Sequence, residues 1–201
     1  MKMNLKFATI AAALAAAAGC FYEPESADRT VPAGNRIYSK DGTMTEVDAA
    51  LFGATPASVD YLNLDRNQLT NVAAVASLTG LKWLRLNGNR LDALPDLKSC
   101  AKLRRIYLRN NRFSAVPETL KDLPELTDID LSGNPVKELP EWLMRKTGLK
   151  NLSFSRTQLE RLPEDLSAWR TLQSLQLGDL RLGKDEMARI RAAIPDVRIV
   201  F

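Results

Sequence analysis

The sequence predicts an α/β solenoid: a curved parallel sheet on one side, short helical or 3-10 turns on the convex side, and a cap at each end. Three observations predict this fold. A segment with fixed apolar positions recurs six times between residues 59 and 182, at intervals of 22 or 23 residues. Asparagine holds one fixed position in the first four copies, and the flanking apolar segments lack the repeat. With 201 residues, 45% of them hydrophobic, the chain can build one such domain.

The first residues have the features of an export signal. Lys2 and Lys6 precede an apolar run over residues 7–18, and no acidic residue occurs before Glu23. This order is typical of a secretory signal peptide, and the run is too short to span a bilayer as a helix. We therefore expect residues 1–19 to be a signal peptide.

The signal segment ends in a sequence that resembles the lipobox of bacterial lipoproteins. The small residues Ala17, Ala18 and Gly19 stand directly before Cys20. The resemblance implies that Cys20 is acylated, becomes the first residue of the mature chain and attaches the exported protein to a membrane. Phe21 follows where Asp would favour the inner membrane, so the resemblance implies the outer membrane, on its periplasmic or its cell-surface side. The alternative is an ordinary signal peptide followed by an incidental thiol.

Two segments precede the repeats. Residues 20–35 hold the lipidated cysteine and then proline, glycine and charged residues without an apolar period, which is typical of a flexible tether. Residues 36–58 are the predicted N-terminal cap. Within this cap Thr43 and Glu46 match a capping box, and apolar residues follow at near-helical spacing. We therefore expect a helix at this end of the solenoid.

The six copies, residues 59–182, share three apolar positions, then usually Asn, then another apolar position. In the second copy these are Leu81, Leu84, Leu86, Asn89 and Leu91. The pattern resembles the L-x-x-L-x-L-x-x-N-x-L segment of the leucine-rich repeat family. Alternation at Leu84 and Leu86 predicts a short strand with one face inward, and stacking one strand per copy predicts a parallel sheet of six or seven strands.

The repeated asparagine has a structural explanation. It stands where the chain turns off the strand, and its amide can bond buried main-chain groups that no regular structure satisfies. Thr157 takes this position in the fifth copy and Leu180 takes it in the sixth, so we expect the row to stop near the C-terminal end. The asparagines of this structural ladder are Asn67, Asn89, Asn111 and Asn134.

The segments between strands and the end of the chain complete the predicted solenoid. Proline recurs in the connecting segments, where it suits the first position of a short helix. These prolines are Pro95, Pro117, Pro140 and Pro163. Residues 183–201 are the predicted C-terminal cap, because Met187, Ile190 and Ile194 share one helix face and apolar alternation from Val197 predicts a last strand.

The concave face is the predicted binding surface. In leucine-rich repeat proteins the non-leucine positions of each strand segment face outward on the concave side, so the resemblance implies which residues lie there. Aromatic, arginine and acidic residues cluster at these positions in the first four copies, and small neutral residues follow. Because Tyr, Trp and Arg are enriched at binding hot spots, we expect this cluster to bind an unidentified protein partner. The residues are Tyr61, Trp83, Arg85, Arg105, Tyr107, Arg109, Asp128 and Asp130.

The sequence leaves other uses of this face open. Arginines stacked on Tyr and Trp and paired with Asp128 and Asp130 would form a self-contained solvated face. Aromatic rings also stack on sugars, so binding of glycan or peptidoglycan is an alternative, as is a purely structural role in the cell envelope. An enzyme using Asp128 and Asp130 as an acid pair is disfavoured, because the neighbouring positions provide neither pocket nor nucleophile.

Composition argues against catalysis and against nucleic-acid binding. The chain contains no His, which removes the commonest general base, the imidazole-dependent triads and every His-bearing zinc site. The net charge of +4 falls to +2, from 26 minus 24, once Lys2 and Lys6 are removed with the signal. That is too small to indicate nucleic acid as a partner. We therefore expect a monomeric binding module without catalytic residues, cofactor or metal.

Overall fold

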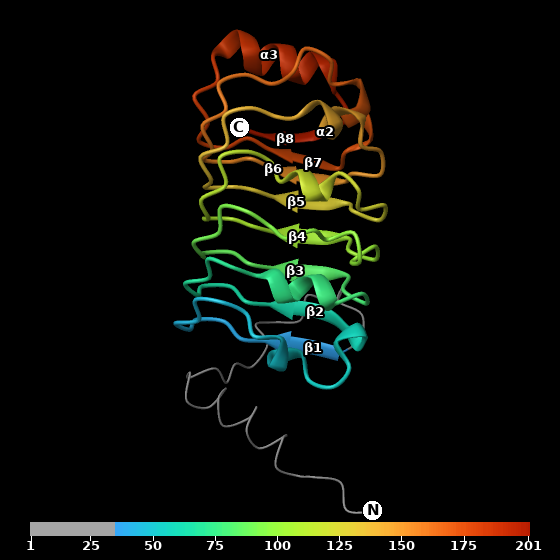
Figure 1. Ribbon diagram of the computed structural model, residues 1–201. Helices are drawn as coiled ribbons and strands as arrows, with labels where there is room; N and C mark the ends of the chain where they lie inside the picture. Colours follow the sequence, from blue (N-terminus) through green and yellow to red (C-terminus); the bar gives the residue numbers. More distant parts are fainter. Residues whose placement is uncertain (1–34) are drawn as a thin grey trace, which may run out of the picture.

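The computed structural model describes residues 35–201; the predicted signal peptide, the predicted lipidation site Cys20 and the chain up to residue 34 lie outside that range. Eight strands form one sheet in the order β1 to β8, and each strand pairs in parallel with its neighbours in the sequence. Figure 1 shows them stacked along the long axis of the molecule, with β1 at one end and α3 over the other. The predicted α/β solenoid is confirmed.

Strands and short helices alternate along the chain. The strands are β1 (Asn35–Tyr38), β2 (Val59–Asn63), β3 (Trp83–Arg85), β4 (Arg105–Tyr107), β5 (Asp128–Asp130), β6 (Asn151–Ser153), β7 (Ser174–Gln176) and β8 (Arg198–Val200). The 3-10 helices are η1 (Ala49–Phe52), η2 (Pro56–Ser58), η3 (Ala73–Ser77), η4 (Glu118–Leu120) and η5 (Ser167–Thr171). The α-helices are α2 (Glu141–Arg145) and α3 (Lys184–Ala193). Below, a coil is a strand together with the residues up to the next strand, and it takes the name of its strand.

The core lies between the sheet and the connecting segments. The central residues of β2 to β7 stand opposite one another in register, and each is at most 2% exposed. They are Leu62, Leu84, Ile106, Ile129, Leu152 and Leu175. Each coil therefore buries its apolar residues against the coils before and after it, as expected of a solenoid.

Cys100 belongs to this core. Its side chain is fully buried, and its Sγ lies 3.6 Å from the carbonyl oxygen of Val75. Burial raises the pKa of the Cys100 thiol, because the thiolate would have to leave water. The residue thus packs as a small hydrophobe.

Two of the four prolines in the connecting segments precede a helix, and two do not. Pro117 directly precedes η4 and Pro140 directly precedes α2, each followed by a glutamate in the first turn. Pro95 and Pro163 precede no helix, so the expectation of a helix after each proline was wrong for these two. At Pro163 the main-chain oxygen accepts a hydrogen bond from Arg189 of α3 instead.

The N-terminal cap is a coil of the solenoid, not a separate helix. β1 pairs with β2 so that Ile37 stands opposite Leu62 and Tyr38 stands opposite Asn63. The sequence did not predict this strand, because residues 36–58 lack the leucine pattern. The sheet therefore has eight strands instead of the expected six or seven.

The predicted helix beginning at Thr43 was wrong. Glu46 forms a parallel bridge with Asn71 of the next coil, and the carbonyl oxygen of Met44 accepts the N–H of Gln68 at 2.9 Å. These bonds to the β2 coil use main-chain groups that a helix would have used internally. The helix in this region is instead the short η1, which begins after Asp48.

A residue with a left-handed backbone conformation stands just before the ladder position of each of the six repeats. The residues are Arg66, Gly88, Asn110, Gly133, Arg156 and Asp179, with φ between 54° and 70°. At Gly133 a side chain would also meet its neighbour, since an added Cβ would lie 2.2 Å from the Asn110 side-chain oxygen. The chain leaves each of the strands β2 to β7 through this backbone conformation.

Helix α3 caps the C-terminal end. Ile190 and Ile194 are fully buried against the core. The guanidinium of Arg189 donates to the Leu162 carbonyl oxygen at 3.0 Å, and Glu186 accepts the Leu162 N–H at 2.9 Å. The predicted helix and last strand are both present, and no helix among residues 35–201 is long and apolar enough to cross a membrane.

Candidate functional site

Four aromatic side chains form a row across the N-terminal half of the sheet, from β1 to β4. Neighbouring ring centroids are 5.1, 5.3 and 6.0 Å apart. The row consists of Tyr38, Tyr61, Trp83 and Tyr107. Parallel pairing produces it, because register places Tyr61 opposite Trp83. We call these residues the aromatic row; the sequence predicted the last three and missed Tyr38.

Burial within the aromatic row differs from the sequence expectation. Tyr61 is 5% exposed and Trp83 is 7% exposed, whereas Tyr107 is partly exposed. Burial raises the pKa of Tyr61. The Nε1 of Trp83 is buried without a hydrogen-bond partner among the described residues. The Tyr61 and Trp83 rings therefore present little surface, and they support the face rather than protrude from it.

Arg85 is fixed beside the aromatic row by a carboxylate. Its Nε donates to Oδ2 of Asp65 at 2.9 Å, its Nη2 lies 2.7 Å from the same oxygen, and its guanidinium lies 5.8 Å from the Tyr107 ring centre. Burial alone would lower the pKa of Arg85, but the Asp65 carboxylate and Tyr61 outweigh burial and raise it. Arg85 is thus held in one position.

Two further arginines lie on the same face. The guanidinium of Arg105 lies 4.5 Å from the Trp83 ring centre, and its Nε is 3.9 Å from Oδ2 of Asp128. Arg109 has an exposed side chain, while its main-chain N–H donates to the Asn87 side chain at 2.9 Å. The stacking and pairing that a self-contained face requires are therefore present, and part of the arginine surface still faces solvent.

The two aspartates have separate partners. Asp128 is 8% exposed and accepts hydrogen bonds from the Thr127 hydroxyl and from the Asn151 side chain. Asp130 accepts the N–H of Ser132 at 2.9 Å. Each carboxylate has a local structural use, and neither lines a described cavity. The described residues also hold no group of three or more His, Cys, Asp or Glu that could bind a metal.

Comparisons with known proteins agree with this architecture. The family model described as Leucine Rich Repeat matches residues 102–123, which is the length of one repeat. A solved internalin from Listeria monocytogenes covers 83% of the chain at 20% identity with a TM-score of 0.62. The chain folds as a leucine-rich repeat solenoid.

Other solved structures of leucine-rich repeat proteins are also similar. The APL1 leucine-rich repeat domain covers 71% of the chain at 25% identity with a TM-score of 0.62. A leucine-rich repeat protein of Leptospira interrogans covers 79% at 20% identity with a TM-score of 0.48. The chain spans 58% of the Leptospira structure, 54% of the internalin and 38% of APL1. The comparison with curated proteins gave no match.

The asparagine ladder joins each of the β2 to β5 coils of the leucine-rich repeat solenoid to the coil before it. The Nδ2 of Asn111 donates to the Leu108 carbonyl of its own coil and to the Leu86 carbonyl of the preceding coil, both at 2.9 Å. Its Oδ1 accepts the Leu91 N–H at 3.1 Å. Asn67, Asn89 and Asn134 repeat the same three kinds of bond.

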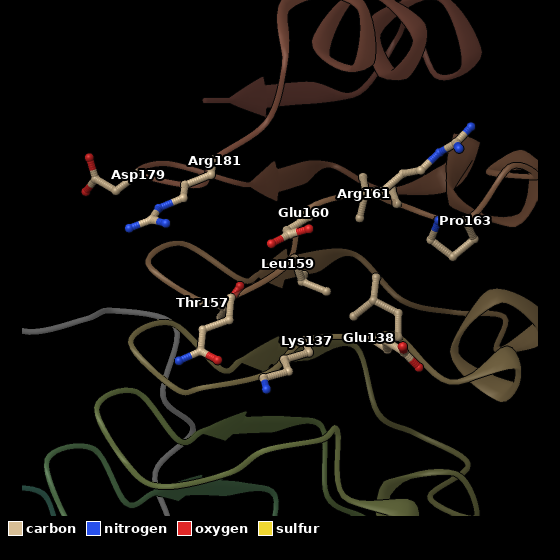
Figure 2. A pocket seen from close by; sticks show the side chains of 12 residues that line it. Lys137, Glu138, Thr157, Leu159, Glu160, Arg161, Pro163, Asp179 and Arg181 are labelled. Atoms are coloured by element: carbon tan, nitrogen blue, oxygen red, sulfur yellow. The ribbon is translucent and has the colours of Figure 1, made fainter.

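The ladder ends where its residue changes. Within the described part of the chain the Thr157 hydroxyl donates only to the Phe154 carbonyl of its own coil, at 2.7 Å. Leu180 has no polar side-chain atom. Beside these residues lies a cavity of about 930 Å³ on the side of the solenoid, drawn in Figure 2. Sequence reasoning located the end of the ladder but not this cavity.

Proposed function

We propose that the protein is a binding module of the cell envelope that contacts a protein partner through the N-terminal half of its concave face. The observation that carries the proposal is the exposed part of the β4 coil. Tyr107 and Arg105 are partly exposed there and Arg109 is exposed, while the buried Trp83 ring packs against both Tyr107 and Arg105. Aromatic and arginine side chains that are already held in position lose little conformational entropy when a partner binds.

The geometry supports a protein partner better than a glycan. Sugars bind to aromatic side chains by stacking on an open ring face. Arg105 lies over the Trp83 ring, and Tyr61 and Trp83 are both largely covered. What faces solvent is guanidinium and phenol at the edges of the row, which suits hydrogen bonding to carboxylates and main-chain carbonyls.

Attachment to the envelope is part of the proposal and rests on the sequence alone. We propose that Cys20, after removal of residues 1–19, is acylated and anchors the mature chain in the outer membrane. The solenoid would then be a partner-binding domain at the end of a short tether. Leucine-rich repeat domains are generally protein-binding modules and typically non-catalytic, which agrees with this role.

The test is crosslinking in intact cells followed by purification and mass spectrometry. The double variant Arg105→Ala with Arg109→Ala should lose the partner captured by the native protein. The matched control is Arg90→Ala with Arg112→Ala, which removes two exposed arginines outside the concave cluster and should retain the partner. Equal capture by both double variants would reject the concave site. In the same cells Cys20→Ser should release the protein from the membrane fraction, and unchanged sedimentation would reject the anchor.

A further inference from the structure

A hollow of about 500 Å³ lies between the connecting segments of the β4 and β5 coils. One side is formed by η4 and the residue after it, and the other side by α2 and its flanking residues. These segments connect strands and do not belong to the concave face, so the hollow is separate from the site of the proposed function. Its lining includes Glu118, Lys121, Glu141, Trp142, Arg145 and Lys146.

Two side chains of the β5 coil reach across to the β4 coil. The Nε1 of Trp142 donates to Oε1 of Glu118 at 2.9 Å. The Nζ of Lys146 donates to the main-chain carbonyl oxygens of Lys121 and Leu123, at 3.0 and 2.8 Å. Trp142 lies in α2 and Lys146 directly follows it, four residues later, so both side chains leave the same side of the helix. Both are therefore fixed in the lining of the hollow.

The helix that carries Trp142 is anchored in the core. Leu143 is fully buried, and its carbonyl oxygen lies 3.4 Å from Nε1 of the buried Trp169. Trp142 itself is partly exposed and lines the hollow. The volume falls within the range of small-molecule sites, about 300–1,000 Å³. The hollow thus offers an aromatic surface on a fixed support, on which a flat ring can stack.

The charges of the hollow favour an anion. Glu141 pairs with Arg145 at 3.0 Å, and the nearby Asp122 pairs with a different lysine. Within residues 35–201 neither Lys121 nor Lys146 forms an ion pair. Burial lowers the pKa of Lys146, and the charge of Asp122 offsets only part of that effect. Since carbonyls accept two N–H groups of this partly buried ammonium, the third can meet an added negative charge.

We propose that this hollow binds a planar aromatic carboxylate. The ring would stack on the indole of Trp142, and the carboxylate would accept hydrogen bonds from the ammonium groups of Lys121 and Lys146. An inorganic anion would leave the indole surface uncovered, and a neutral aromatic molecule would leave both ammonium groups without a counter-charge. A free acid and the C-terminal aromatic residue of a peptide carry the same two groups. The site is independent of the concave-face function proposed above.

The probe is naphthalene-2-carboxylate, added to the ¹⁵N-labelled 201-residue chain. The indole N–H resonance of Trp142 should shift and saturate as the ring stacks on the indole. Naphthalene-2-carboxamide keeps the ring without the charge, and acetate keeps the charge without the ring. Each should bind at least about tenfold more weakly than naphthalene-2-carboxylate. N-acetylphenylalanine represents the end of a peptide: tighter binding than the naphthalene acid would assign the ligand to a peptide terminus, and weaker binding to a free acid.

Two variants test the lysines. Lys146→Gln keeps a donor for the neighbouring carbonyls and removes the charge, while Lys121→Glu reverses a charge on the β4 side of the hollow. Each should weaken binding of naphthalene-2-carboxylate about tenfold or more. The matched control is Lys102→Glu, which makes the same change of net charge as Lys121→Glu at an exposed residue outside the lining and should leave the affinity unchanged. A native-like spectrum of each ligand-free variant separates lost binding from lost folding.

Four results would overturn the proposal. One is a Trp142 indole resonance that millimolar naphthalene-2-carboxylate does not shift. Two others are a carboxamide or an acetate that binds as tightly as the probe, because the site would then recognise only the ring or only the charge. The last is an equal loss of affinity in Lys121→Glu and Lys102→Glu, which would reduce the effect to net charge. Arg105→Ala with Arg109→Ala should bind the probe as the native protein does, so this site and the concave face are tested separately.

Discussion

A single asparagine side chain forms hydrogen bonds with main-chain groups of two coils. Asn111 donates to Leu86 and Leu108 and accepts from Leu91, and it is 8% exposed. The three main-chain groups lie at buried residues, so water cannot replace the amide. Thr157 stands at the same position of the β6 coil but makes only one such bond. The two residues thus allow a matched comparison.

Asn111→Ala should destabilise the protein by about 3 kcal/mol, because it leaves buried donor and acceptor groups unpaired. Thr157→Ala should cost about 1 kcal/mol, since one hydrogen bond is lost at a half-buried site. Urea unfolding followed by circular dichroism measures both changes. Equal losses would mean that the ladder contributes no more to stability than an ordinary side chain at the same position.

Other residue-scale features could not be predicted from the sequence. The left-handed position is filled by Arg66, Gly88 and Asn110 in successive coils, and these side chains share no property that would mark it. Tyr61 and Trp83 were expected to protrude because strand alternation places them on the concave face. Alternation decides the face but not the burial, and neighbouring aromatic and arginine side chains cover both rings.

At the scale of elements, the repeated strands could be predicted because every copy carries the same apolar spacing. β1 could not be, since Ile37 is its only aliphatic residue and its coil lacks the ladder asparagine. The expected helix at Thr43 failed because a local capping pattern competes with pairing to the next coil. There the N–H of Met44 reaches the Asn67 side chain at 3.3 Å, and the carbonyl of Thr45 accepts the Thr70 N–H at 2.9 Å.

The docking of α3 should depend on pH through Glu186. Its hydrogen bond to Arg189 lowers the pKa of Glu186 below the ordinary value of 4.5, against a smaller opposing effect of burial. A carboxyl whose pKa is lower in the folded state contributes stability above its unfolded pKa and loses it as pH falls through its folded pKa. That contribution should therefore be complete above about pH 4.5 and decline at lower pH.

Glu186→Gln should lower Tm at pH 7 and make Tm less dependent on pH below 4.5. Some dependence will remain, because the pKa values of Asp41 and Asp165 are also lowered by hydrogen bonds. The control is Glu141→Gln, whose ion pair with Arg145 is exposed and should contribute little. Parallel Tm curves for native protein and Glu186→Gln from pH 3 to 7 would contradict the docking role.

At the scale of the whole molecule, each coil is stabilised by its contacts with adjacent coils. The stability of the solenoid therefore depends on the weakest contact between two adjacent coils as well as on the average strength of these contacts. The asparagine ladder joins the coils from β1 to β5. Thr157 makes fewer bonds between the β5 and β6 coils, and Leu180 makes no side-chain hydrogen bond between the β6 and β7 coils. Glu186 and Arg189 of α3 bond the β6 coil from outside, but among residues 35–201 the main-chain N–H and carbonyl of Leu159 have no hydrogen-bond partner.

Hydrogen exchange should therefore be graded along the solenoid. Amides of equivalent sheet bonds have similar geometry: Leu108 donates to Asp130 at 2.8 Å and Phe154 donates to Gln176 at 2.9 Å. Bond length alone would give both the same protection, so a slower Leu108 amide and a faster Phe154 amide would report the weaker junction. Thr157→Asn together with Leu180→Asn should slow exchange at Phe154 by restoring the ladder while leaving Leu108 unchanged. If native exchange is uniform from Leu84 to Leu175, the solenoid opens as one unit and the end of the ladder has no effect on its cooperativity.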